Sequence, residues 1–188
     1  PIDTSFSGED VKAGIKAWHE HTTTSPDGTH LSHYHSMMDE PGHLSFLARL
    51  ISIPGDIGFD PPSWITSVIT SILKDPGSPK VTRLRRIHIF DALFNLSKRI
   101  VFARRTVHSA EDNDFLGEYQ HGSRSGRGYL DAIAMKRFAI DLVFLLKINM
   151  IFMENDAKSC YDRIIVSLCS IIFQRFGVPA PFLRMWTS

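Results

Sequence analysis

The chain has 188 residues, of which 43% are hydrophobic and 22% charged, and its formal net charge is +1. This is the composition of a globular protein with enough chain to bury a core, and the sequence contains no internal repeat and no low-complexity region. The apolar runs all fall well short of the ~18 residues that a membrane span needs, so we expect no membrane partner.

The cysteines and the first ten residues favour an intracellular protein of the cytoplasm or nucleus. Cys160 and Cys169 lie nine positions apart in an apolar pattern, which is typical of buried free thiols. The opening residues, PIDTSFSGED, lack the apolar core of a signal peptide. Because they begin without Met, we expect the chain to be a piece of a longer protein. The oligomeric state is left open.

Most of the chain has the apolar spacing of amphipathic helices. Between two proline-rich loops, for example, an i, i+4, i+8 stripe runs from Trp64 to Leu73 and predicts a helix opened by Pro61 and Pro62. In chain order, the predicted helices span residues 8–22, 31–38, 42–51, 62–73, 91–109, 129–146 and 159–176. Gly177 and Pro179 are expected to end the last of these.

Two segments have other patterns. Residues 81–90, VTRLRRIHIF, are compatible with a strand or with an irregular arm. Residues 148–153, INMIFM, have the length and composition of a buried strand. A single strand cannot stand alone, so its sheet partners would lie mostly outside this sequence. The expected fold class is α+β, predominantly helical.

Positive charge gathers in two places. Between Lys80 and Arg105 there are eight Lys or Arg residues and a single acid, Asp91. This stripe is either a surface for a polyanion or a solvated helix face. The loop QHGSRSGRG carries Arg124 and Arg127 among glycines that allow a close approach to phosphate. Its alternative reading is a flexible basic loop.

Asp156 comes three positions after the end of the apolar segment 148–153, and Asp162 comes six positions later. A carboxylate between a strand and a helix is well placed to hold Mg²⁺, which prefers few carboxylates plus phosphate oxygens. In the simpler alternative, Asp156 caps the helix and Asp162 pairs with a neighbouring cation.

Four blocks in order resemble the fingers and early palm of a non-LTR retrotransposon-type reverse transcriptase. TSPDGTHLSHY resembles an early fingers motif, and RLRRIHIFDALFNLSKRIVFARR resembles the block with Arg-Pro-Ile and a long helix. EDNDFLGEYQHGSRSGRGYLDAI resembles the Gln-x-Gly-Phe-Arg-x-Gly-Arg-Ser block. IFMENDAKSCYDRI resembles the first catalytic palm motif. The resemblance implies fingers over residues 1–147 and the beginning of a truncated palm over residues 148–188.

The resemblance also implies roles for individual residues. Asp156 would be the catalytic aspartate that ligates two Mg²⁺ ions during deoxynucleotidyl transfer, and Ala157 would add a backbone carbonyl. Tyr161 would stack under the incoming sugar. Asp162 has no clear catalytic duty in the motif.

The basic residues take the remaining roles. Arg85, assisted by Lys80, would lie over the triphosphate of the incoming dNTP. Arg124 and Arg127 would grip the template backbone. The implied partners are therefore an RNA template, a DNA primer and a dNTP.

Departures from the family pattern bear on activity. Arg86 stands in place of the proline of Arg-Pro-Ile, Ser123 in place of a phenylalanine, and Gly128 in place of a serine. The sequence contains no Asp-Asp pair, and so lacks the aromatic-x-Asp-Asp motif that supplies the second catalytic carboxylates. We therefore expect a fragment of an RNA-directed DNA polymerase that is inactive alone. The alternatives are a non-catalytic nucleic-acid-binding remnant and a helical interaction domain.

Overall fold

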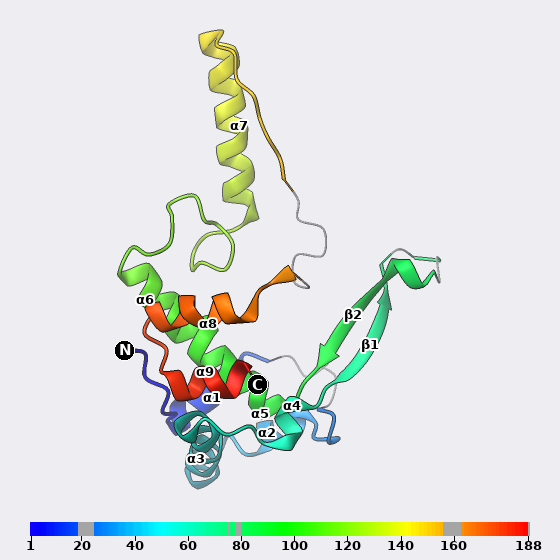
Figure 1. Cartoon of the computed structure of the whole chain (residues 1–188), viewed down its shortest axis with the longest axis vertical. Coiled ribbons are helices and arrows are strands. Elements are labelled where there is room, and N and C mark those ends of the chain that lie inside the picture. Colours follow the sequence, from blue (N-terminus) through cyan, green and yellow to red (C-terminus); the bar gives the residue numbers. More distant parts are fainter. Residues whose placement is uncertain (19–24, 75, 78–79, 156–162, 188) are drawn as a thin grey trace.

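A computed structural model describes residues 1–18, 25–74, 76–77, 80–155 and 163–187. Helices dominate these residues, and one antiparallel two-stranded sheet accompanies them, so the α+β, mostly helical class is confirmed at this level. Figure 1 shows a helical body from which a β-hairpin and a long helix extend. The helices are α1 (Gly8–Lys16), α2 (Leu31–Ser36), α3 (Pro41–Ile57), α4 (Pro62–Ile65), α5 (Ala92–Lys98), α6 (Val107–Asp112), α7 (Tyr129–Leu146), α8 (Val166–Arg175) and α9 (Ala180–Thr187).

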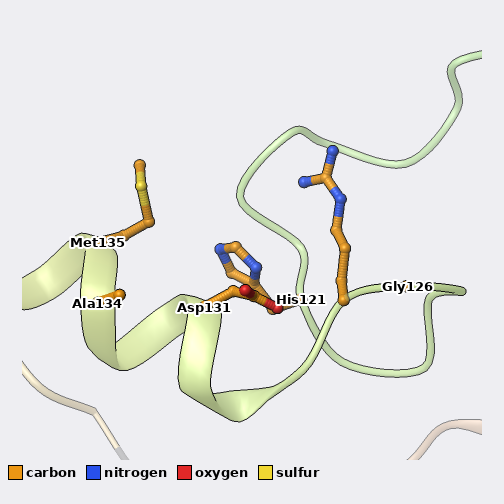
Figure 2. A pocket seen from close by; sticks show the side chains of 6 residues that line it. His121, Gly126, Asp131, Ala134 and Met135 are labelled. Atoms are coloured by element: carbon orange, nitrogen blue, oxygen red, sulfur yellow. The ribbon is translucent and has the colours of Figure 1, made fainter.

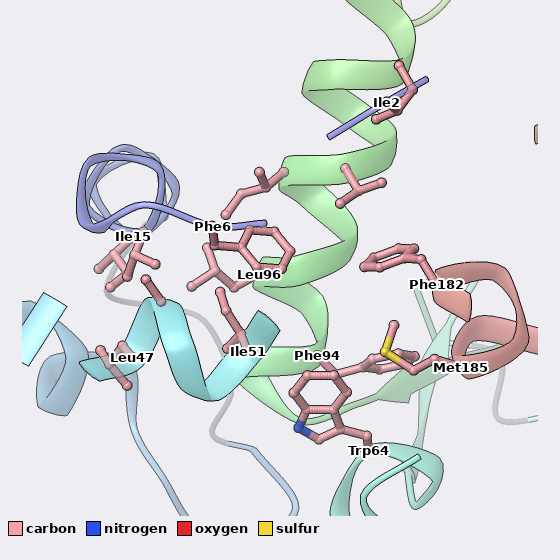
Figure 3. Close-up of a cluster of buried hydrophobic side chains, with 14 of the residues drawn as sticks. Ile2, Phe6, Ile15, Leu47, Ile51, Trp64, Phe94, Leu96, Phe182 and Met185 are labelled. Atoms are coloured by element: carbon pink, nitrogen blue, oxygen red, sulfur yellow. The ribbon is translucent and has the colours of Figure 1, made fainter. Parts of the chain in front are cut away.

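The core lies among α1, α3, α5 and α9 (Figure 3). Ile15, Ile51, Leu96 and Phe182 come from these four helices and are fully buried. Burial of such side chains contributes roughly 1.5–3 kcal/mol each, which makes this cluster the main source of stability. Helices distant in sequence are thereby held as one body.

Arg105 fastens the N-terminal segment to this body. Its guanidinium donates to the carbonyls of Asp3 and Ser5, each at 2.7 Å, and to the carboxylate of Asp10 at 2.8 Å. Asp10 in turn completes a capping box with Ser7 at the start of α1. Arg105, which belongs to the basic stripe, is therefore engaged in contacts within the chain.

The predicted helix 91–109 is confirmed as one continuous helical run. It begins at α5, passes through the π-helical segment η2 (Arg99–Thr106) and ends with α6. Asp91 caps it, accepting hydrogen bonds from the backbone N–H groups of Leu93 and Phe94. Inside η2, the Thr106 hydroxyl donates to the carbonyl of Val101, five residues earlier.

The predicted helix 62–73 is wrong beyond its first turn. After the short helix α4, residues Val68–Leu73 form strand β1, which pairs antiparallel with β2 (Leu84–Ile89). The 3₁₀ turn η1 (Val81–Arg83) precedes β2. Of the two readings of residues 81–90, the strand is therefore correct. β-branched residues dominate β1, and such side chains favour a pleated strand over a helix.

Helix α7 occupies the predicted residues, 129–146, but its surroundings are unexpected. The helix has no buried residue, and it extends away from the body in Figure 1. The next residues, 148–153, run back alongside it without joining a sheet, so the predicted strand is wrong in this structure. Lys136 on α7 forms an ion pair with Glu154 at the end of this return segment. Without a neighbouring strand, an apolar extended segment has no backbone partners for a ladder.

The remaining predicted helices occur in shortened or extended form. α1 ends at Lys16 rather than near residue 22, and α3 continues through Pro54 to Ile57. The last predicted helix, 159–176, begins only at Val166 among the described residues. After it, Gly177 has a φ of +89°, the left-handed conformation expected of a helix-terminating glycine.

Candidate nucleic-acid interface

The β1–β2 hairpin carries the first half of the basic stripe into solvent. Both strands are exposed along most of their length, and Figure 1 shows the hairpin projecting from the body. Arg85 pairs across the ladder with Ile72, and Arg86 pairs with Ser71. The side chains of adjacent residues in a strand point to opposite faces, so Arg85 and Arg86 place positive charge on both faces of the hairpin. Exposed Lys80 precedes β2. The hairpin therefore presents Lys80, Arg85 and Arg86 to solvent.

In the second half of the stripe Arg104 is exposed, whereas Lys98 and Arg105 are engaged within the fold. Lys98 lies over the rings of Phe90 and Phe94, with its Nζ 4.6 and 4.0 Å from the ring centroids. Burial lowers the pKa of Lys98. Like Arg105, this lysine therefore stabilises the fold rather than presenting charge to a partner.

Aromatic side chains anchor the base of the hairpin. Phe90, just after β2, contacts His88 and Phe94 at ring-centroid distances of 6.0 and 5.7 Å. Trp64 packs on Phe94 at 5.5 Å and is itself buried. This cluster fixes the point at which the hairpin leaves the body, while the strands beyond it remain exposed.

The glycine-rich loop between α6 and α7 is held by its own arginines. Arg124 donates through Nε to the Glu111 carboxylate at 3.3 Å and through a terminal nitrogen to the Gly117 carbonyl at 3.0 Å. Its side chain is only 13% exposed. The Ser125 backbone N–H donates to the same carboxylate at 3.2 Å. In this structure Arg124 therefore fastens the loop to α6.

Arg127 is exposed and donates to the backbone carbonyl of Glu118. It lines a shallow pocket of about 310 Å³ at the N-terminal end of α7 (Figure 2). The other lining residues are His121, Gly126, Asp131, Ala134 and Met135. Asp131 accepts a hydrogen bond from the Gly128 backbone N–H at 2.6 Å, so its carboxylate already neutralises the helix end. The pocket therefore combines a cation, an imidazole and a carboxylate.

The predicted catalytic centre lies outside the described residues. This applies to Asp156, Ala157 and Tyr161, and so to the proposed Mg²⁺ ligands and the sugar-stacking ring. Elsewhere, within the described ranges, His, Cys, Asp and Glu side chains form no group of three or more that could hold a metal ion. Likewise, no helix in the described part of the chain is both long and apolar enough to cross a membrane.

The structure does not bring the two predicted basic sites together. The hairpin with Arg85 extends from one side of the body, and the loop with Arg124 and Arg127 lies on another side, between α6 and α7 (Figure 1). Their assignment to dNTP and template respectively stays a prediction.

Sequence reasoning missed His121. Among the described residues its Nδ1 is the buried side-chain nitrogen without a hydrogen-bond partner, and its ring faces the pocket. Its position beside the glycine-rich basic loop was the available signal.

No protein-family model matches this chain, and a search of curated proteins finds no similar sequence.

Proposed function

We propose that this chain is the fingers and early palm portion of a reverse transcriptase of the non-LTR retrotransposon kind. In this proposal the β1–β2 hairpin contacts nucleic acid or nucleotide phosphate. Asp156 and Ala157 would hold Mg²⁺, which stabilises the charge that develops on a transferring phosphoryl group. Because the sequence has no Asp-Asp pair, the chain alone would lack the second carboxylates and would not polymerise DNA.

The observation that carries the proposal is the exposed, cationic hairpin whose second strand carries Arg85. A two-stranded ribbon is narrow enough to enter a nucleic-acid groove, and its arginines can bind phosphate bidentately. From Ser67 to Phe90 the sequence holds five Lys or Arg residues and one acid, Asp75. Such an element concentrates positive charge in a protein whose overall net charge is only +1.

The same hairpin also favours a second candidate, a nucleic-acid-binding remnant without catalysis. The two candidates share phosphate binding and differ in whether Asp156 takes part in chemistry. A binding assay tests what they share, and primer extension separates them.

Binding to a short primer–template duplex can be followed by fluorescence anisotropy across a salt series. We expect affinity to fall linearly on logarithmic axes, with each phosphate contact contributing about 0.7–0.9 to the slope. Replacing Lys80, Arg85 and Arg86 together with glutamine should reduce the slope by about 2–3. The matched control replaces exposed Lys12, Lys16 and Arg49 with glutamine, which removes the same charge far from the hairpin. Equal losses in both variants would refute a binding role for the hairpin.

Primer extension addresses catalysis. The 188-residue chain should incorporate no nucleotide, whereas a longer chain that supplies an aromatic-x-Asp-Asp segment should incorporate dNTPs with Mg²⁺ and lose this activity on Asp156→Asn. If the longer chain binds duplex but never incorporates nucleotides, the non-catalytic remnant is the better description. Incorporation by the short chain would overturn the argument from the missing carboxylates.

A further inference from the structure

Helix α7 exposes far more apolar surface than a solitary helix can keep in water. It is apolar nearly all round, and an isolated surface helix normally has a polar face. Met135, Phe138, Leu142 and Leu145 are 48%, 71%, 52% and 77% exposed. Their spacing of three, four and three residues places them in one stripe along the helix.

The return segment does not cover this stripe. Lys136, which pairs with Glu154 of that segment, projects about 140° around the helix from the stripe at roughly 100° per residue. Residues 148–155 therefore run along the other side of α7, as Figure 1 shows for the two adjacent chain segments. In the described part of the chain Met135 also lines the pocket beside the glycine-rich loop, whereas Phe138, Leu142 and Leu145 remain at least half exposed.

The accessible area of the whole chain, to which the hairpin and α8 also contribute, is larger than a compact monomer of this mass would expose. A compact monomer of 21.3 kDa exposes about 9,100 Å² by the usual scaling of area with mass, whereas this chain exposes 13495 Å². The excess of about 4,400 Å² is several times the ~800 Å² that each partner buries in a standard protein interface. The chain thus has ample surface for a stable dimer.

The stripe is also complementary to itself. Met135 with Leu145, and Phe138 with Leu142, have the same midpoint at Ile140. When two copies of α7 cross antiparallel at Ile140, Met135 of each copy lies opposite Leu145 of the other, and Phe138 lies opposite Leu142. Such reciprocal contacts are what a two-fold axis requires.

Charges at the margin of the stripe fit the same arrangement. Arg137 and Asp141 form an i, i+4 ion pair at 3.1 Å, and Asp141 lies between Phe138 and Leu145 at helical spacing. Their midpoint is Ala139, one residue from the apolar midpoint. Antiparallel pairing therefore brings Arg137 of one copy toward Asp141 of the other, along the same edge.

We propose that the stripe of Met135, Phe138, Leu142 and Leu145 is the interface of an antiparallel homodimer of α7. The proposal concerns an apolar surface remote from the hairpin and does not depend on nucleic-acid binding. Sedimentation equilibrium of the full 188-residue chain should give a mass approaching twice 21.3 kDa as concentration rises.

Paired substitutions locate the interface. Phe138→Glu with Leu142→Glu should raise the dimer dissociation constant by about a hundredfold or more, since carboxylates would be buried without partners. The control, Ile133→Glu with Phe144→Glu, adds the same charge to exposed positions on the opposite side of α7 and should leave dimerisation intact. Circular dichroism of each variant verifies that the helices remain.

Cross-linking tests the orientation. With both native cysteines replaced by serine, a mixture of the Met135→Cys and Leu145→Cys variants should form disulfide-linked pairs, whereas each variant alone should not. A wild-type monomer, a polydisperse aggregate, equal dissociation of the stripe and control variants, or cross-linking within one variant would each overturn the proposal.

Discussion

Replacing Gly55 by alanine tests the packing of α9 on α3, which closes one side of the core. Gly55 lies in α3, opposite the fully buried ring of Phe182 in α9. A Cβ added at Gly55 would stand 2.7 Å from one carbon of that ring and 3.3 Å from a second. Real Cβ atoms are not found so close to a neighbour, so the ring or the helix must shift.

The expected cost follows from two opposed effects. Alanine favours a helix over glycine by up to about 1 kcal/mol. Overpacking a dense core costs about 1–3 kcal/mol, and Phe182 has little room to retreat because the ring of Phe102 lies 5.6 Å away on centroids. The net loss should be about 1–2 kcal/mol of unfolding free energy, equivalent to a melting temperature about 2–8 °C lower.

Urea unfolding followed by circular dichroism measures this loss, with Gly42→Ala in the same helix as the control. A Cβ at Gly42 meets no atom within 4 Å, so that variant should be neutral or more stable. Combining Gly55→Ala with Phe182→Leu should cost less than the sum of the single changes, because the smaller side chain relieves the clash. If Gly55→Ala is as stable as Gly42→Ala, the described contact between α3 and α9 is wrong.

Two further predictions concern ionic contacts of the body. Burial raises the pKa of Asp10, but hydrogen bonds from Ser7 and the charge of Arg105 outweigh this and hold its pKa below the usual value. The stabilisation from Asp10, about 1 kcal/mol for a partly exposed group, should thus be complete above about pH 4 and disappear as the pH falls through the lowered pKa. Chemical denaturation of Asp10→Asn across pH measures it, with Glu9→Gln as the control, and a difference that persists in acid would contradict it. Removing the loop's anchor in Glu111→Ala should speed tryptic cleavage after Arg124 or Arg127 roughly tenfold, whereas Asp112→Ala should not.

The sequence predicts the helices best where local signals and periodicity agree. For α7, an Asp at the third position caps the backbone of Gly128, and mostly apolar residues follow to Leu146, interrupted only by Lys136, Arg137 and Asp141. The bounds 129–146 could be read directly from this pattern. The Asp91 cap similarly marks the start of the long helix.

The first strand of the hairpin was predicted as a helix because its apolar spacing is misleading. Val68, Ile69, Ile72 and Leu73 match a helical stripe, yet they form β1, and helix-like spacing in a short segment does not exclude a strand. The pairing of Ile72 with Arg85 is set across a loop, and this non-local contact cannot be read from periodicity. Tertiary pairing here overrides the local pattern.

The candidate site was predictable in composition but not in geometry. The sequence marks Arg124 as a cation on a glycine-rich loop, but its contact with Glu111, thirteen residues earlier, depends on how that loop folds back. The same limit applies to His121, whose place in the pocket follows from the start of α7. The sequence therefore identifies the polar side chains of the site, whereas the contacts that they make are determined by the fold.

The π-helical segment η2 has a consequence for how this chain tolerates changes in length. Between Val101 and Thr106, both buried, the run takes a step of five residues inside η2, wider than the three- or four-residue repeat of a regular α-helix. Deleting one residue within η2 would restore the regular repeat but turn everything downstream by about 100°. Arg105 would then swing away from Asp10, and α6 would present another side to the glycine-rich loop. Insertions and deletions should therefore be far more harmful here than single substitutions on the exposed side.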